Sequence, residues 1–324
     1  MSETAAASFL ATVPLLEGIA EEQLDELARV MRPRDLPAGK ILWRQGERAK
    51  EMLVIAEGFV SVTLRLPGDR TVELSTLGPG DLLGEIPLLD GGRHAATARV
   101  VESARVLSLT RADLAALVSR GHPTAFALKR GIARHTCSRL RLQLEALSRK
   151  LGAEESSGPP PEAPQLFDDL EFCDPPDSRY VSRLGTLREF DSLALWGFLT
   201  AGRYARCPAG STLVVEGQPS NACYLTINGA VEKVIVRGGR RIRVGLAGPG
   251  QVFGYESLID GGPSPVTATA RERALLLVLP QGQFERLFNG ETSGSHVFLD
   301  VIHRDLVAAL RQALRPHARL AASV

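Results

Sequence analysis

The residues best suited to ligand binding lie in one short segment, 82–98, which reads LLGEIPLLDGGRHAATA. Small residues let backbone N–H groups approach a phosphate, a cation neutralises its charge, and a carboxylate accepts a hydrogen bond from a sugar hydroxyl. Gly84, Glu85, Arg93 and His94 supply these residue types within one turn. The segment therefore favours a site for a phosphate-bearing ligand. The simpler alternative is that Glu85 and Arg93 only stabilise the turn.

The segment is part of an internal repeat, which fixes the domain organisation. Pro37-Ala38-Gly39 recurs as Pro208-Ala209-Gly210, at an offset of 171 residues, whereas Gly78-Pro79-Gly80 recurs as Gly248-Pro249-Gly250, at an offset of 170. The lost residue is predicted to lie in a hairpin turn that is one residue shorter in the second copy than residues 66–69 are in the first. Two tandem copies of one domain explain the pattern.

Each copy is predicted to be mainly β. Short runs with β-branched residues, at 51–56, 59–66 and 72–77, are separated by turns that contain glycine, which is typical of antiparallel hairpins. We expect two tandem jelly-roll-like β-barrels, each with N-terminal and C-terminal helices. In the first copy the helices are predicted at 21–31, 111–118 and about 122–151. The predicted domains are 8–151 and 190–324, joined by a linker at 152–189.

Helix 122–151 carries an apolar seam that follows heptad spacing from Ala133 onward. Its members are Phe126, Ala133, Cys137, Leu140, Leu144, Leu147 and Leu151. The seam could form a homodimer through helix 122–151, or it could pack on the protein's own barrel, and the sequence does not decide between them. The remaining positions are largely basic and are expected to be solvated.

The linker has an acidic composition. Residues 152–163 read GAEESSGPPPEA, and from Glu154 to Asp177 there are eight acidic residues and no Lys or Arg. Such a segment is expected to be extended. Four apolar side chains interrupt the acids and could make a short docking segment, although a solvated linker is the simpler alternative; they are Leu166, Phe167, Leu170 and Phe172.

Overall composition excludes several classes of protein. The 324 residues carry 38 Lys and Arg against 37 Asp and Glu, so no general attraction to nucleic acid or to an anionic membrane is expected. No apolar run is long enough to span a membrane, and the four cysteines show no metal-binding spacing. We therefore expect a soluble cytoplasmic chain. The basic hairpin formed by Lys233, Arg237, Arg240, Arg241 and Arg243 is interpreted as a solvated sheet edge.

With these motifs in hand, the sequence resembles the cyclic nucleotide-binding domain family, which includes the catabolite activator proteins and the regulatory subunits of protein kinase A. The resemblance covers about residues 8–150 and 190–315. It rests on Leu83-Gly84-Glu85, on Ala95-Ala96-Thr97 and on the PAGxxLxxxG pattern upstream. It implies that Glu85 holds the ribose 2′-hydroxyl and that the amides of Gly84 and Ala95 face the cyclic phosphate and the sugar.

The resemblance also shows where the first copy departs from the family. The family's phosphate-binding arginine falls on His94, with Arg93 one residue before it. A histidine is mostly neutral at pH 7, so the site would be weaker and pH-dependent. Thr136, on the following helix, is the candidate for base recognition, and the small Ala95 favours cAMP over cGMP.

In the second copy Gly254 is retained, but Tyr255 stands at the position of the ribose carboxylate and Ser264 at that of the arginine. This copy is expected to have kept the fold and lost the nucleotide.

We therefore predict a non-catalytic regulatory or adaptor protein. The first domain would sense a cyclic nucleotide, with cAMP as the candidate ligand and no required cofactor, and would transmit binding to a partner protein. After the second barrel only residues 295–322 remain, which is room for one helix and none for a helix-turn-helix, so no DNA-binding module is expected. No membrane partner is expected either, because no apolar run is long enough to span a membrane. The alternative is a ligand-independent scaffold of two degenerate domains. A cupin-like metalloenzyme is disfavoured, because of six histidines only His94 falls within a predicted barrel.

Overall fold

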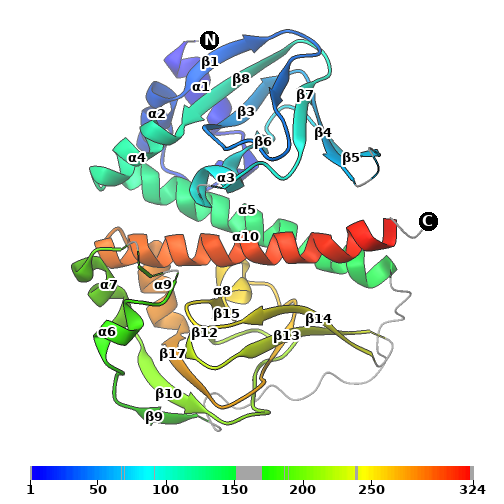
Figure 1. Ribbon diagram of the computed structural model, residues 1–324. Helices are drawn as coiled ribbons and strands as arrows, with labels where there is room; N and C mark the ends of the chain where they lie inside the picture. Colours follow the sequence, from blue (N-terminus) through cyan, green and yellow to red (C-terminus); the bar gives the residue numbers. More distant parts are fainter. Residues whose placement is uncertain are drawn as a thin grey trace. The chain divides into compact units, whose positions relative to one another are not determined.

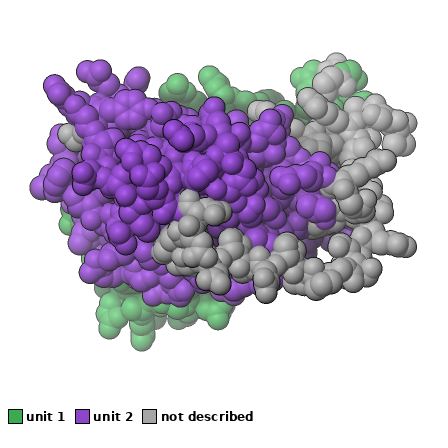
Figure 2. Space-filling view, turned by 90° about the horizontal axis from the view of Figure 1, so that it is seen from below, with its two compact units in different colours: residues 1–132 green, residues 133–324 purple. Residues whose placement is uncertain are grey.

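The computed structural model describes residues 2–66, 68, 70–90, 92–150, 170–185, 187–188, 190–237 and 240–321. The chain divides into two compact units, Met1–Ile132 and Ala133–Val324, coloured separately in Figure 2. Each unit contains antiparallel sheets with helices before and after them in the chain (Figure 1). The predicted fold, mainly β in two tandem copies, is confirmed. The strands of each copy form two separate sheets, and no closed barrel is present among the described residues.

Unit 1 contains two four-stranded sheets, with the strand orders β1-β8-β3-β6 and β2-β7-β4-β5. Its strands are β1 (Arg32–Leu36), β2 (Ile41–Trp43), β3 (Glu51–Glu57), β4 (Val60–Arg65), β5 (Thr71–Leu77), β6 (Leu82–Leu83), β7 (Thr97–Val100) and β8 (Ala104–Thr110). Its helices are α1 (Glu3–Leu10), the 3-10 turn η1 (Pro14–Leu16), α2 (Glu21–Val30), α3 (Glu85–Asp90), α4 (Arg111–Ser119) and the first part of α5 (Pro123–Lys150).

Unit 2 contains a five-stranded sheet, β15-β12-β17-β10-β9, and a four-stranded sheet, β11-β16-β13-β14. Its strands are β9 (Glu171–Cys173), β10 (Arg203–Cys207), β11 (Thr212–Val214), β12 (Ala222–Asn228), β13 (Val231–Arg237), β14 (Arg240–Ala247), β15 (Val252–Phe253), β16 (Thr267–Ala270) and β17 (Ala274–Pro280). Its helices are the rest of α5, α6 (Ser178–Val181), α7 (Ser192–Leu199), α8 (Glu256–Asp260), α9 (Gln281–Asn289) and α10 (Ser293–Ala321). In the described part of the chain, no helix has the length and apolar character needed to cross a bilayer.

The strand registers repeat between the two units. Val62 on β4 pairs with Ser75 and Ala98. In the second copy Lys233 on β13, 171 positions after Val62, pairs with Gly245 and Ala268, which lie 170 positions after Ser75 and Ala98. In the first hairpin the N–H of Leu66 donates to the carbonyl of Arg70, whereas in the second Arg237 pairs with Arg240. The turn of the second copy is thus one residue shorter, as the change of offset predicts.

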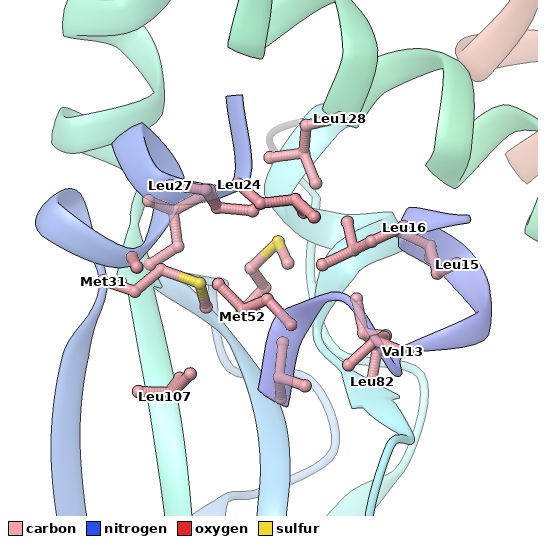
Figure 3. Packing of buried hydrophobic residues seen from close by; sticks show 14 of the residues in the cluster. Val13, Leu15, Leu16, Leu24, Leu27, Met31, Met52, Leu82, Leu107 and Leu128 are labelled. Carbon is pink, nitrogen blue, oxygen red and sulfur yellow. The ribbon is translucent and has the colours of Figure 1, made fainter. Parts of the chain in front are cut away.

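Strand β3 explains how the core of unit 1 is divided. It lies between β8 and β6 and has both faces covered, so its side chains alternate between two clusters. Met52 and Val54 pack in a cluster with the helices, where Leu27 of α2 and Leu128 of α5 lie near Met52 (Figure 3). Leu53 and Ile55 pack in a second cluster between the two sheets. Strand β6, which lies beside β3, leads directly into Gly84 and Glu85.

Helix α5 is one continuous helix shared by both units, because the boundary falls between Ile132 and Ala133. The apolar seam expected to form a homodimer is buried within the single chain, with Ala133 and Cys137 fully buried, Leu144 5% exposed, and Leu140 and Leu147 also buried. The alternative, in which the seam packs on the protein's own chain, agrees with this burial. The prediction that this seam forms a homodimer through helix 122–151 is therefore wrong, because the chain itself already covers the apolar side chains that a second copy would need to contact. Leu151 lies outside the described residues.

Part of the acidic linker is also used within unit 2. Residues 151–169, with Leu166 and Phe167, lie outside the described residues. Leu170 and Phe172 pack on the core of unit 2, and Phe172 pairs with Ala205 across β9 and β10. The guanidinium of Arg203 lies 3.7 Å from the centre of the Phe172 ring. The described half of the expected docking segment is thus an edge strand of the second domain.

Candidate functional site

The first site begins at a left-handed glycine between β6 and α3. Gly84 has φ +78°, and a Cβ at this position would lie 2.8 Å from the carbonyl oxygen of Glu51. Only glycine adopts this conformation without strain and fits so close to a neighbouring backbone. The carbonyl of Gly84 accepts a hydrogen bond from the N–H of Leu88, which starts the helix. The turn places Glu85 at the first position of α3, where its side chain is buried, with 2% exposure.

His94 is fixed by its backbone and its ring. Its N–H donates to the carbonyl of Glu47, and its carbonyl accepts from the N–H of Gly46, both at 2.8 Å. The imidazole stacks on the indole of Trp43, with ring centres 4.1 Å apart. Burial lowers the pKa of His94 below 6.5, although the charge of Glu47 opposes this shift. The ring at the position of the family's arginine is therefore neutral at pH 7.

Arg93 is exposed, and its guanidinium donates to the carbonyl of Gly46 at 2.7 Å. With His94 it lines a surface hollow of about 450 Å³, whose other lining residues are Leu42, Trp43, Glu47, Arg48, Lys50 and Glu51. Glu85 is not among them. The two residues expected to supply the phosphate's cation thus make different contacts, one with the chain's own backbone and the other with Trp43.

The remaining predicted residues of the first site are divided between the units. Ala95 follows His94 directly and is exposed. Thr136 belongs to unit 2, where its side chain is 1% exposed and its hydroxyl has no hydrogen-bond partner among the residues that the structure describes. Gly84, Glu85, Arg93, His94 and Ala95 all belong to unit 1, where a Cβ at Gly84 would lie 3.4 Å from the imidazole of His94, whereas Thr136 lies in the part of α5 that belongs to the other unit.

One feature of unit 1 was missed by sequence reasoning. Strand β5 leaves Val72 41% exposed and Leu74 48% exposed. The equivalent residues of β14 in unit 2, Ile242 and Val244, are half-buried, and α10 packs against that strand. Apolar side chains of this edge strand are thus exposed in the first copy and half-buried in the second.

The second site has the same backbone and different chemistry. Gly254 has φ +77°, and Tyr255 follows it, fully buried. The phenol of Tyr255 donates to Asp305 Oδ2 on α10, with the two oxygens 2.6 Å apart. Ser264 is buried and satisfied locally, because its hydroxyl donates to the carbonyl of Val266 at 2.8 Å.

Lys233 completes the second site. Its Nζ lies 3.3 Å from Asp305 Oδ2, and the two side chains are only 7% and 5% exposed. Burial alone would lower the pKa of Lys233, but the charges of Asp305 and Glu256 hold the pKa above its usual value. The interpretation of Lys233 as part of a solvated basic edge was therefore wrong. Its place between Val231 and Ile235 in an alternating strand was the signal that it faces inward.

Residues 254–264, which contain α8 and are called the cassette of the second copy, also contact α5. Arg141, on the part of α5 in unit 2, makes a two-pronged pair with Asp260, with Nη2 2.7 Å from Oδ1, and donates to the carbonyl of Pro263. Burial opposes the charge of Asp260, but the hydrogen bond from Arg141 keeps the pKa of this carboxyl below its usual value. One residue of the helix expected to carry a solvated basic face thus has a specific partner.

Comparison with known proteins assigns this arrangement to a family. The model of the cyclic nucleotide-binding domain matches residues 33–120 and 205–291, together more than half of the chain. The cyclic AMP receptor protein of Thermus thermophilus is 36% identical over 138 residues, which are 42% of this chain and 62% of that protein. A cyclic nucleotide-gated potassium channel of Rhizobium etli is 34% identical over 37% of this chain and 32% of the channel. The chain thus spans less than two thirds of the length of these curated relatives.

Among solved structures, the regulatory domain of protein kinase A from Toxoplasma gondii, crystallised with cAMP, covers 88% of this chain and 91% of its own, at 18% identity and a TM-score of 0.34. The crystal structure of the catabolite activator protein of Thermus thermophilus covers 42% of this chain and 71% of its own, at 29% identity and the same TM-score of 0.34.

Gly84→Ala tests the turn that places Glu85. The left-handed backbone costs a non-glycine residue about 1–2 kcal/mol, and the approach to Glu51 should add about 1–3 kcal/mol. Gly80→Ala is the matched control, because Gly80 has φ +87° but its nearest neighbour, Pro14, is 3.8 Å from the Cβ position. Urea unfolding should show a larger loss for Gly84→Ala than for Gly80→Ala. Equal losses would contradict the close approach.

His94 predicts a pH dependence of stability. Its pKa is lower in the folded than in the unfolded chain, so the unfolded chain takes up the proton first and stability falls as the pH drops below about 6.5. His94→Gln should lose this contribution. We expect the drop in urea midpoint between about pH 7.5 and about pH 5 to be smaller for His94→Gln than for the wild type. Identical drops would show that the ring is not desolvated.

Proposed function

The chain belongs to the cyclic nucleotide-binding domain family, and from this premise we propose that it is a regulatory protein whose first copy binds a cyclic nucleotide and whose second copy does not. Glu85 carries the first half of the proposal. It is a buried carboxylate at the start of α3, directly after a left-handed glycine. A carboxylate held in this way suits a ribose 2′-hydroxyl, and the exposed apolar side chains of Val72 and Leu74 on β5 of the same unit are proposed to receive the base.

The first copy should bind weakly and with proton uptake. At the position of the family's arginine the first copy offers the neutral ring of His94, Arg93 is engaged with Gly46, and the other cations of the hollow, Arg48 and Lys50, are exposed, so that water screens their charges. A cyclic phosphate that contacts His94 would raise the pKa of the imidazole, so the ligand should bind more tightly at lower pH. cAMP is the proposed ligand, since Ala95 supplies no hydroxyl for a guanine.

Thr136 enters the proposal only conditionally. It lies on α5, the single helix that both units share, and its buried hydroxyl has no hydrogen-bond partner among the described residues. Its proposed role is to donate a hydrogen bond to the base. Binding would then be transmitted by a shift of population between two conformations of α5.

The output is proposed to be a second protein, reached without catalysis in this chain, in the cytoplasm. The relatives include a receptor protein and a gated channel, in keeping with a ligand-responsive module that acts on something else.

A ligand-independent scaffold is the second candidate. It is favoured by the contact of Arg93 with Gly46, which leaves the exposed guanidinium on the protein's own backbone. In that case both copies would be interaction modules. The calorimetric experiment below separates the two candidates.

Titration calorimetry of the full chain with cAMP, cGMP and cyclic dinucleotides should show one site per chain for a cyclic mononucleotide. Glu85→Gln should weaken binding about tenfold or more, because a charged acceptor becomes neutral. His94→Arg should strengthen it by a similar factor near pH 8, because a permanent cation replaces a neutral ring.

Glu73→Gln is the matched control, since Glu73 is an exposed carboxylate on β5 of the same unit. Arg93→Gln reports whether the guanidinium leaves Gly46 for the phosphate. The absence of heat with every ligand at high concentration would favour the scaffold. Binding unchanged by Glu85→Gln would overturn the site.

A further inference from the structure

The second copy holds a carboxylate from its own chain in its interior. Asp305 lies on α10 and is 6% exposed. A single oxygen, Oδ2, accepts from the phenol of Tyr255 at 2.6 Å and from the ammonium of Lys233 at 3.3 Å. The donors come from two separate elements, β13 and the turn before α8. Two donors that converge on one oxygen form an anion-binding arrangement.

The equivalent positions of the first copy lack this arrangement. Lys233 corresponds by register to Val62, and Tyr255 corresponds to Glu85. Asp305 lies 170 positions after His135 on the equivalent helix. The cation, the hydroxyl donor and the carboxylate thus occur together in one copy and are all absent from the other, which indicates that they act as one unit.

Asp305 is the anion that this arrangement needs. A buried ammonium without a partner is very costly, so Lys233 needs a negative charge in contact with it. Glu256 is also fully buried nearby, but burial raises its pKa, and its Oε2 has no hydrogen-bond partner among the described residues. The carboxylate that makes hydrogen bonds with both donors is therefore Asp305.

We propose that the second copy is self-liganded: Lys233 and Tyr255 form an anion site whose resident ligand is the carboxylate of Asp305, and the site accepts a small free carboxylate when Asp305 is removed. Helix α10 is then held on its own sheet without any nucleotide. This inference deepens the proposed loss of nucleotide binding in the second copy, and it does not depend on what the first copy binds.

Chemical rescue tests the proposal. Asp305→Ala in the full chain leaves Lys233 and Tyr255 facing a space of carboxylate size, and the thermal unfolding temperature should fall by several degrees. Adding formate or acetate in place of chloride, at constant ionic strength, should raise that temperature along a saturable curve. The double variant Asp305→Ala with Lys233→Met should lose the response, and Tyr255→Phe in the Asp305→Ala background should weaken it.

Glu171→Ala is the matched control for general salt effects. It removes a carboxylate from an exposed pair with Arg206, 3.5 Å apart in the same unit, and should show no response to formate beyond that of the wild type. The proposal is overturned if formate stabilises Asp305→Ala no more than this control, or if the response survives Lys233→Met.

A double-mutant cycle covers the case in which Asp305→Ala does not fold. Asp305→Asn and Lys233→Met each leave one charge without its partner, whereas the double variant leaves neither. The two losses of stability should therefore be strongly non-additive, and additive losses would overturn the pairing. Calorimetry of Asp305→Asn with cAMP keeps the two proposals apart, because nucleotide binding by the first copy should be unchanged in it.

Discussion

A buried positive charge must have a negative partner, and this constraint organises the second half of the molecule. Lys233 points into unit 2 from the middle of β13, where water cannot solvate it. The partner comes from α10, 72 residues later in the chain, so the strand and the helix have to meet. Tyr255 joins the same oxygen and links the cassette turn to that helix. Removing one partner of such a buried pair lowers the free energy of unfolding far more than replacing both partners by apolar residues.

The same cassette is held from its other end by Arg141. Its contacts with Asp260 and Pro263 fix the end of α8 and the loop after it to helix α5. Cys137, one turn earlier, donates from its thiol to Asp260 at 3.4 Å, and burial raises the pKa of this thiol, which keeps it protonated. Helix α5 thus ends in a set of specific contacts within unit 2 and begins in the apolar core of unit 1.

Features that depend on residues close together in sequence were predicted correctly. The repeat, the hairpins and the shorter second turn follow from glycine positions and from strand alternation, and the registers of β4 and β13 confirm them. Pairings distant in sequence were not accessible. Lys233 was interpreted together with the basic residues near it in sequence, because no residue near it in sequence indicates its contact with Asp305. The seam that begins at Ala133 has the same heptad pattern whether it packs against a second chain or against its own. One sequence signal for Asp305 was present, because this acidic residue interrupts the apolar stripe of α10 one turn after Val301.

The first copy is the complementary case, in which the cations of the site lie at the surface, because Arg48, Lys50 and Arg93 line its hollow and are exposed. Val62 takes the place of the lysine, and His94 is neutral because it is buried against Trp43. A cyclic phosphate that enters this hollow would meet exposed cations, whose attraction water screens, and a neutral imidazole that has to take up a proton before it can neutralise the anion. In the proposed function the buried carboxylate of Glu85 would accept a hydrogen bond from the sugar. The second copy pairs its buried ammonium with a carboxylate of its own chain. Under the two proposals the second copy would therefore stay closed without a ligand, whereas a response of the first copy would depend on its buried carboxylate and on the protonation of its imidazole.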